Sequence, residues 1–208
     1  MKRDIHLSET TERVVRASRA DARDWLADAP VCVMLARHGI VHVGVAEVTH
    51  PYEVRRPDLS GTFMMVCSAG EGRVWLEGKW WPMRANAACL APPHAFHAYR
   101  AVPRKAWSIA WVRYQEPDGA LPIVNARAPV VAAFDGGPLA AAIVGLHREA
   151  SGTASPAAMQ LWVDLIQHYA RTFAEPWHWT TACGPPGRPW HATLPPTGPC
   201  RSSRNSPV

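Results

Sequence analysis

The sequence lacks the features that would place it in a membrane or in an oxidising compartment. No run of 18 apolar residues occurs among its 208 residues, and the opening MKRDIHLSETTERVV has no apolar signal-peptide core. The five cysteines are an odd number without paired spacing, which argues against a disulfide framework and a zinc ribbon. Charged residues make up only 19%, too few for a disordered acidic chain or a coiled coil. We therefore expect a cytoplasmic protein that does not associate with membranes.

Motifs that commonly indicate catalysis are missing as well. The chain shows no Ser-His-Asp arrangement, no phosphate-binding P-loop and no Gly-x-Gly-x-x-Gly. Paired carboxylates are also missing from its strand-rich part. We therefore expect neither enzymatic activity nor a bound cofactor.

Acidic residues are absent after Glu175, and this changes the meaning of the net charge of +5. A basic chain is typical of nucleic-acid binding. Three of the 22 basic residues and eight of the 20 prolines, however, lie at positions 176–208. Positions 1–175 hold 19 basic and 17 acidic residues, a balance of only +2. The basic charge is therefore weak evidence for DNA binding.

Short strands are predicted for the middle of the chain, residues 30–116. Runs of β-branched and aromatic residues alternate there with Gly, Pro and Asp, at the spacing of an all-β sandwich or barrel. In one run Trp107, Ile109 and Trp111 alternate with small residues, as on a strand with one apolar face. The predicted fold is mainly β with appended helices, a small closed or jelly-roll barrel that can hold one ligand.

Tight turns and flanking helices complete the predicted architecture. Hairpins are expected at Gly70-Glu71-Gly72 and at Glu77-Gly78-Lys79. Residues 1–29 form an N-terminal helical segment in this interpretation, with an amphipathic helix from Ser8 to Asp28. Residues 117–175 form a linker and an antiparallel helix pair. The pair comprises Pro138 to Ala150 and a helix that opens at Ser155-Pro156 and stops at Pro176.

The second predicted helix carries large apolar side chains at three-to-four residue spacing. Such a stripe packs against the chain's own barrel or, where a face is left over, forms a subunit interface. We expect a homodimer through helix 155–174. The candidate interface residues are Trp162, Leu165, Ile166 and Tyr169.

A set of short motifs occurs in a characteristic order along residues 10–175. Its members are Arg56-Pro57, Gly70-Glu71-Gly72, Leu90-Ala91-Pro92-Pro93, His97-Ala98-Tyr99, Trp107 and Trp111-Val112-Arg113-Tyr114. In this order and spacing they resemble the N-terminal effector-binding cupin domain of AraC-type transcription regulators. The resemblance implies a barrel that binds a small effector, followed by a helix pair used for dimerisation.

Ligand contacts are implied by the resemblance where motifs match. The arabinose-responsive member binds its sugar inside the barrel, and its arginine, tyrosine and tryptophan contacts correspond to Arg56, Tyr99 and Trp111. A guanidinium fork suits sugar hydroxyls, and an aromatic ring suits the apolar face of a pyranose. The family's histidine in that last strand is Ile109 here, which favours a different sugar or a less polar effector. His97 is a further candidate for hydrogen bonding in the pocket.

Two alternatives of other classes remain open. A stand-alone cupin enzyme, such as a metal-dependent isomerase or dioxygenase, would use His94 and His97 as ligands. Such sites need three or four converging ligands, and residues 73–84 supply no histidine and only the acid Glu77, so we expect no metal. A lectin-like module without a regulatory role is the other alternative. Metal analysis of the purified protein distinguishes the enzyme from the sensor.

The residues from 176 onward have no helical periodicity and are rich in Pro, Gly, Ser and Thr. AraC-type regulators continue at this point into a domain with two helix-turn-helix motifs. We interpret 176–208 as a disordered tail that is translated out of frame. Reading GC-rich codons two bases further on permits amphipathic helices. On this interpretation the chain is truncated before its DNA-binding domain, and we expect no specific DNA binding.

Overall fold

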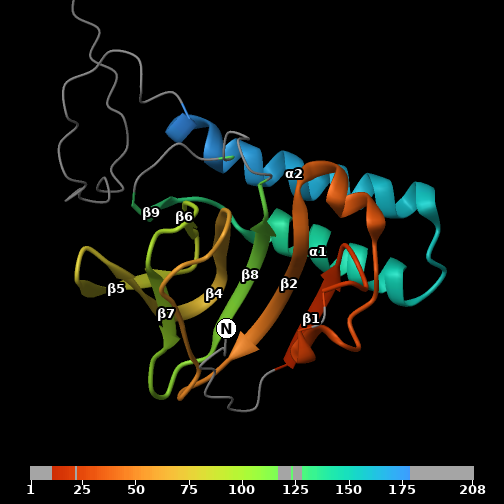
Figure 1. Ribbon diagram of the computed structural model, residues 1–208. Coiled ribbons are helices and arrows are strands. Elements are labelled where there is room, and N and C mark those ends of the chain that lie inside the picture. The colour runs from red at the N-terminus through yellow and green to blue at the C-terminus, as the bar shows by residue number, and fades with distance from the viewer. Residues whose placement is uncertain (1–10, 22, 117–122, 124–127, 179–208) are drawn as a thin grey trace, which may run out of the picture.

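The chain forms a curled antiparallel sheet with two helices packed along one side (Figure 1). The computed structural model describes residues 11–21, 23–116, 123 and 128–178. The strands are β1 (Thr11–Arg16), β2 (Ile40–Val48), β3 (Glu53–Arg56), β4 (Phe63–Leu76), β5 (Lys79–Arg84), β6 (Ala87–Ala91), β7 (His97–Ala101), β8 (Trp107–Tyr114) and β9 (Val130–Ala133). The helices are η1 (Asp24–Leu26), η2 (Val33–His38), α1 (Gly137–Ser151) and α2 (Pro156–His178). The predicted β architecture with an appended helix pair is confirmed.

Strand β4 connects the two halves of the curled sheet. Its first half pairs with β6 and β8, and its second half pairs with β5 and β7. The hairpin predicted at Gly70-Glu71-Gly72 is therefore wrong, because these residues lie inside β4. Gly70 has a positive φ of 75° and lies against the Ala106 carbonyl, while Gly72 lies under the Trp107 ring. Both glycines allow a close approach that a Cβ atom would block.

The hairpin predicted at Glu77-Gly78-Lys79 agrees with the structure. Glu77 and Gly78 connect β4 to β5 with positive φ values of 49° and 82°, as a two-residue hairpin of the right twist requires. Asn86 precedes β6 with a φ of 63°. Asparagine tolerates this left-handed conformation better than most residues.

The N-terminal helix predicted from Ser8 to Asp28 is wrong over its described residues. Residues Thr11–Arg16 form β1, which pairs antiparallel with β2, and only Asp24–Leu26 form a short 3-10 turn. Val14 and Val15 pack into opposite faces of the sheet. Two β-branched neighbours that are both buried suit a strand between two apolar layers. Pairing with the edge of β2 outweighed the local helix-start pattern.

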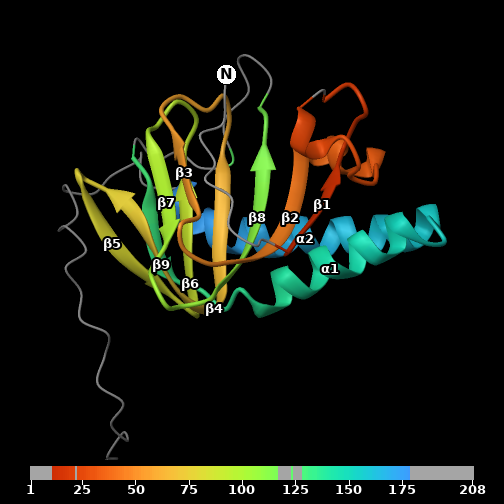
Figure 2. The same cartoon turned by 90° about the horizontal axis from the view of Figure 1, so that it is seen from below.

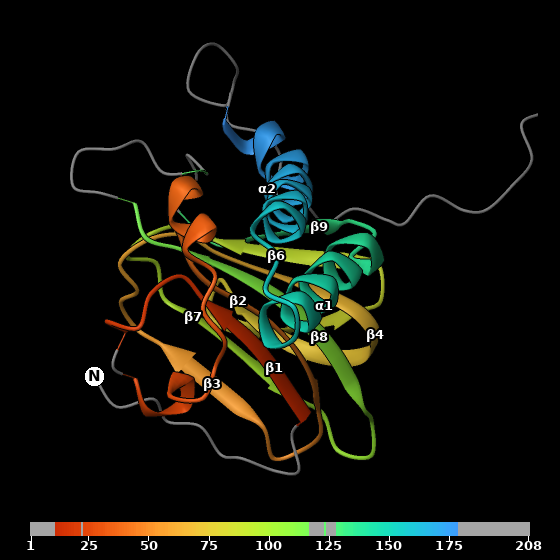
Figure 3. The ribbon, with the colours of Figure 1, turned by 90° about the vertical axis from the view of Figure 1, so that its right-hand side faces the viewer.

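The two helices cover one face of the sheet and leave the other face as the concave interior (Figures 2 and 3). Helix α1 contacts β1, β2, β4 and β8, and α2 packs on α1 and η2. Strand β8 is buried on both sides: Trp107, Ile109 and Trp111 belong to the interior cluster, as the alternation predicts. Val112 and Tyr114 belong to the cluster under the helices.

Two predicted boundaries shift in the structure. Strand β1, outside the predicted 30–116 barrel, joins the sheet through β2, and β9, from the predicted linker, pairs with β6. Helix α2 ends at His178, two residues beyond the predicted stop at Pro176. The predicted tail lies outside the described residues, apart from 176–178. Within the described part of the chain, no helix has both the length and the apolar character needed to span a membrane.

Candidate functional site

The five predicted ligand-binding residues all lie on the concave side of the sheet. Arg56 ends β3 and is the register partner of His97 in β7, and Tyr99 lies two residues further along β7. Ile109 and Trp111 come from β8. All five are buried, with exposed fractions of 8% or less. The structure therefore brings together side chains from three strands that are separated by up to 55 positions in the sequence.

Phe63 lies at the centre of this group, and the sequence analysis missed it. Its ring stacks on His97 with centroids 5.3 Å apart and on Tyr99 at 5.8 Å. The Arg56 guanidinium carbon lies over the same ring, 5.8 Å from its centroid. Phe63 occupies the first position of β4, and nothing in its local sequence distinguishes it from other core aromatics. Only the pairing of β4 with its neighbours shows its role.

Trp111 is held in a fixed orientation on the same side of the sheet. Its indole Nε1 donates a hydrogen bond to His42 Nδ1 at 3.1 Å, and Trp25 packs edge-on against the His42 ring. The ring of Trp111 also lies over Gly44, where a Cβ atom would come within 2.3 Å of it. Because its nitrogen already has an acceptor, Trp111 offers a ligand apolar surface rather than a hydrogen bond.

His97 is neutral in this environment. Burial is the main cause that lowers its pKa to about 4, and the charges of Arg56 and Arg113 lower it further. Its Nδ1 lies 3.2 Å from the Ala95 carbonyl oxygen, so Nδ1 carries the proton and donates it. The other ring nitrogen, Nε2, is then an acceptor. It is buried and has no hydrogen-bond partner among the described residues.

Arg113 joins this group although the sequence analysis gave it no role. It follows Trp107, Ile109 and Trp111 in the same alternation, which is the signal that could have identified it. Only 4% of it is exposed, and burial lowers its pKa to about 10, so it stays charged at neutral pH. Its Nη2 donates to the Ser60 carbonyl oxygen, whereas its buried Nη1 has no partner within the described chain.

The structure separates the two histidines considered as metal ligands. The His94 side chain is 69% exposed and forms an ion pair with Asp58 at 2.7 Å, whereas His97 is buried. No group of three or more His, Cys, Asp or Glu side chains that could hold a metal ion occurs among the described residues. The arrangement thus offers hydrogen bonding, positive charge and aromatic surface.

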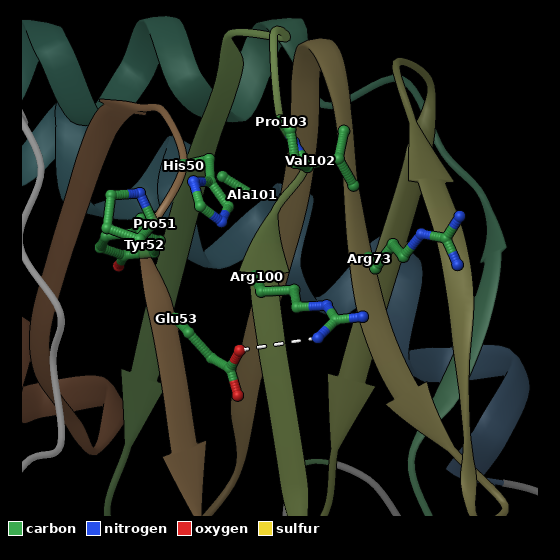
Figure 4. A pocket seen from close by; sticks show the side chains of 9 residues that line it. All are labelled: His50, Pro51, Tyr52, Glu53, Arg73, Arg100, Ala101, Val102 and Pro103. Carbon is green, nitrogen blue, oxygen red and sulfur yellow. Dashed lines mark ion pairs between the residues drawn. The ribbon is translucent and has the colours of Figure 1, made fainter.

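A separate pocket of about 690 Å³ lies on the outer face of the sheet, over β3 and β7 (Figure 4). Glu53 and Arg100 line it and form an ion pair at 3.8 Å, and Arg73 lies nearby. These residues alternate with inward-facing Val54, Tyr99 and Val74, so their side chains face away from the concave interior. It contains none of the residues that the sequence predicts as ligand contacts.

The predicted dimer residues lie on different sides of α2. Ile166 is fully buried against the chain's own core, and Trp162 packs over Gly145 of α1. Leu165 is 40% exposed, and Tyr169 is partly buried. Leu161, which the sequence analysis did not single out, is the most exposed large apolar side chain described, at 67%.

Comparison with known proteins gives one family match. The family model for the AraC-like ligand binding domain matches residues 60–166, about half of the chain. No curated protein matches the sequence. Residues 60–166 hold β4 to β9, α1 and the first half of α2, while β1 to β3, and with them Arg56, precede the matched range.

Solved structures of three bacterial proteins illustrate the similarity. A cupin-like protein from Thermotoga maritima is 11% identical, with a TM-score of 0.41, over 71% of this chain and 88% of that one. The Cupin_2 domain of an XRE family regulator from Enterobacter cloacae is 12% identical, with a TM-score of 0.38, over 53% and 100%. A putative glyoxylate induced protein from Pseudomonas aeruginosa is 20% identical, with a TM-score of 0.37, over 44% and 34%, so the chain spans only about a third of it. At these scores no functional conclusion is drawn from them.

Proposed function

Because this chain belongs to the family of AraC-like ligand-binding domains, we propose that it is a sensor module that binds a small-molecule effector in the interior of its curled sheet. The observation that carries this proposal is the convergence of Arg56, His97, Tyr99 and Trp111 on one buried surface. Polar atoms of Arg56 and His97 lack partners among the described residues. Buried polar groups without partners are costly unless a ligand or water satisfies them.

Each residue has a distinct part in the proposed site. Arg56 and His97 form hydrogen bonds with the effector, while Tyr99 and Trp111 offer aromatic faces to its carbon skeleton. Ile109 offers an apolar contact at the position where the arabinose-responsive relative has a histidine. A sugar or a molecule of similar size suits this mixture. The role is binding without catalysis, in the cytoplasm.

Self-association is the second part of the proposal. Leu161 and Leu165 are exposed on α2, beside the partly buried Trp162 and Tyr169. We infer that a second copy of the chain covers this face. Effector binding inside the sheet then biases the pairing of two copies through the helical layer, because β8 contributes to both clusters.

Thermal unfolding in the presence of pentoses, hexoses and small aromatic acids tests effector binding. A ligand that binds only the folded state raises the unfolding temperature. We expect Trp111→Ala to abolish the shift that an active compound causes. Trp80→Ala is the matched control, because the partly buried Trp80 stacks with Arg100 in the outward-facing series of the sheet. An unchanged shift in Trp111→Ala would place the ligand elsewhere.

A further inference from the structure

The concave interior contains two arginines that no acid neutralises directly. Arg56 and Arg113 are 8% and 4% exposed. Arg56 is the register partner of His97, and Arg113 is the register partner of Phe63, whose ring stacks on His97. The charges of both arginines lower the pKa of His97. Within the described chain, neither forms an ion pair with a carboxylate. The two guanidinium groups therefore place like charges around one neutral histidine.

The carboxylate of Glu116 already accepts hydrogen bonds from a backbone N–H group and from a hydroxyl. Glu116 interacts favourably with Arg113 through its charge. Its oxygens, however, accept hydrogen bonds from Thr62 N at 2.9 Å and Thr62 Oγ1 at 2.5 Å. Asp21 is close enough to influence Arg113, but it is paired with Arg23. The positive charge of Arg56 and Arg113 is thus only partly compensated.

A buried charge without a hydrogen-bonded counterion is costly for a folded protein. The Nε atom of Arg56 and the Nη1 atom of Arg113 have no hydrogen-bond partner in the described structure. An arginine N–H group can only donate, so whatever satisfies these atoms must be an acceptor. A carboxylate satisfies both requirements, since it brings negative charge and two acceptor oxygens. A neutral sugar would supply hydrogen-bond acceptors but would not neutralise the positive charge of the two arginines.

His97 adds a requirement of opposite kind. Its Nε2 atom is a buried acceptor without a partner among the described residues, while Phe63 stacks against the ring. The ligand group beside it must therefore donate a hydrogen bond, as a hydroxyl does. The surrounding wall is apolar and aromatic, formed by Phe63, Tyr99 and Trp107 among others.

We propose that the effector is a small organic hydroxy acid, whose carboxylate is bound by Arg56 and Arg113 and whose hydroxyl donates to His97 Nε2. This rests on the proposed function and names its ligand class. A sugar acid and an aromatic hydroxy acid share this chemistry. The apolar interior receives the remaining carbon skeleton.

Matched pairs of acid and amide test the proposal by thermal unfolding and calorimetric titration at constant ionic strength. The probes are mandelate with mandelamide, 4-hydroxybenzoate with 4-hydroxybenzamide, and glucuronate with glucuronamide, each at 10 mM. We expect at least one acid to raise the unfolding temperature while its amide does not. Arg56→Gln and Arg113→Gln should each weaken its binding about tenfold or more. Arg73→Gln, an exposed arginine on the outer face, should leave the affinity unchanged.

Other outcomes separate the ligand class from the sensor function. If an amide raises the unfolding temperature as much as its acid does, and Trp111→Ala abolishes the shift, the sensor function is supported and the carboxylate ligand class is wrong. If only neutral sugars stabilise the protein, the sensor function is again supported and the carboxylate ligand class is wrong. No shift with any of the three acids at 10 mM overturns the inference, because two buried arginines whose charge is only partly compensated would bind a small carboxylate at that concentration.

A ligand-free measurement provides a second test. Removing one of two like charges relieves repulsion, so Arg56→Met should unfold at a higher temperature than the unmodified protein when no ligand is present. Arg73→Met is the control and should show no gain. A lower unfolding temperature for Arg56→Met would show that Arg56 is a structural residue and would contradict the proposal.

Discussion

The two faces of the curled sheet differ in how fully their buried polar groups are hydrogen-bonded. In the cluster under α1 and α2 the one hydroxyl among the described buried residues is satisfied, because Tyr114 donates to Gln167 Oε1 at 2.8 Å. The concave cluster borders Arg56, His97 and Arg113, whose polar atoms are incompletely satisfied among the described residues. Apolar burial stabilises a fold, whereas unpaired buried polar groups cost stability. The comparison indicates that the helical layer maintains the fold, while the interior retains costly groups for binding.

Truncating the helix-covered core should have the largest effect. Ile143 of α1 is fully buried between the helices and the sheet. Ile143→Ala should lower the free energy of unfolding by about 2–5 kcal/mol, through lost burial and the cavity left behind. Urea unfolding measures this change, and the affinity for an effector should stay the same at temperatures where the variant is folded. A loss of affinity would show that the two faces are not separable.

The concave interior should lose stability in acid because of His97, while in the helical layer burial also lowers the pKa of the partly buried His147. The pKa of His97 is about 4 in the folded chain, against 6.5 for an unperturbed histidine. The unfolded chain therefore binds the proton first, and stability falls as the pH drops from about 6.5 towards 4, by about 3 kcal/mol. Urea midpoints across this range measure the loss. His97→Gln should flatten that part of the profile, and an unchanged profile would assign the acid sensitivity to other groups.

Adding a Cβ atom at Gly44 or at Gly145 would crowd the concave interior or the helical layer, respectively. A Cβ at Gly44 would meet the Trp111 ring at 2.3 Å, and one at Gly145 would meet the Trp162 ring at 2.7 Å. Gly44→Ala and Gly145→Ala should each cost about 1–3 kcal/mol of stability, since the ring must move. Only Gly44→Ala should also weaken effector binding, as calorimetric titration would measure. Equal loss of binding in both variants would contradict a site confined to the interior.

A substitution on the outer surface of the helical layer should have the smallest effect on stability. Leu161 is 67% exposed, so Leu161→Gln should change the free energy of unfolding by less than about 0.5 kcal/mol. It should nevertheless weaken self-association, which sedimentation velocity measures over a range of concentrations. The buried Ile166 offers no comparable test, because its replacement would disturb the core. A Leu161→Gln protein that associates unchanged would locate the interface elsewhere.

Periodicity in the sequence was a good guide to strands and helices with long regular patterns. The alternation in β8 predicted its buried face, because the pattern is local. The three-to-four spacing in α2 predicted the helix, but Leu165 of that stripe is 40% exposed. The prediction failed at β1, where the partner strand β2 outweighed a helix-start pattern. It failed again at Gly70-Glu71-Gly72, which looks like a turn but allows close packing inside a long strand.

The candidate site was only partly predictable. Arg56, Tyr99 and Trp111 were implied by the resemblance to AraC-type regulators, with His97 as a further candidate, and all four lie on the concave side of the sheet. The alternation of β8 could have identified Arg113 as inward-facing, but the place of Phe63 and the missing partner of Arg113 could not be predicted, because such contacts are properties of the folded chain. Which side of α2 carries Ile166 and which carries Leu161 also depends on how the helix lies against the sheet.

The sequence by itself determined the class of fold and the residue types available for binding, because strand and helix periodicities act over a few neighbouring residues. Only the tertiary structure decided that Arg56 and Arg113 share one buried interior with a neutral histidine. The strands that carry them are far apart in the chain and lie near each other through the pairing of β3 with β7, β7 with β4 and β4 with β8. The charge of a site depends on that arrangement, since an arginine in sequence is neither buried nor unpaired until its neighbours are in place.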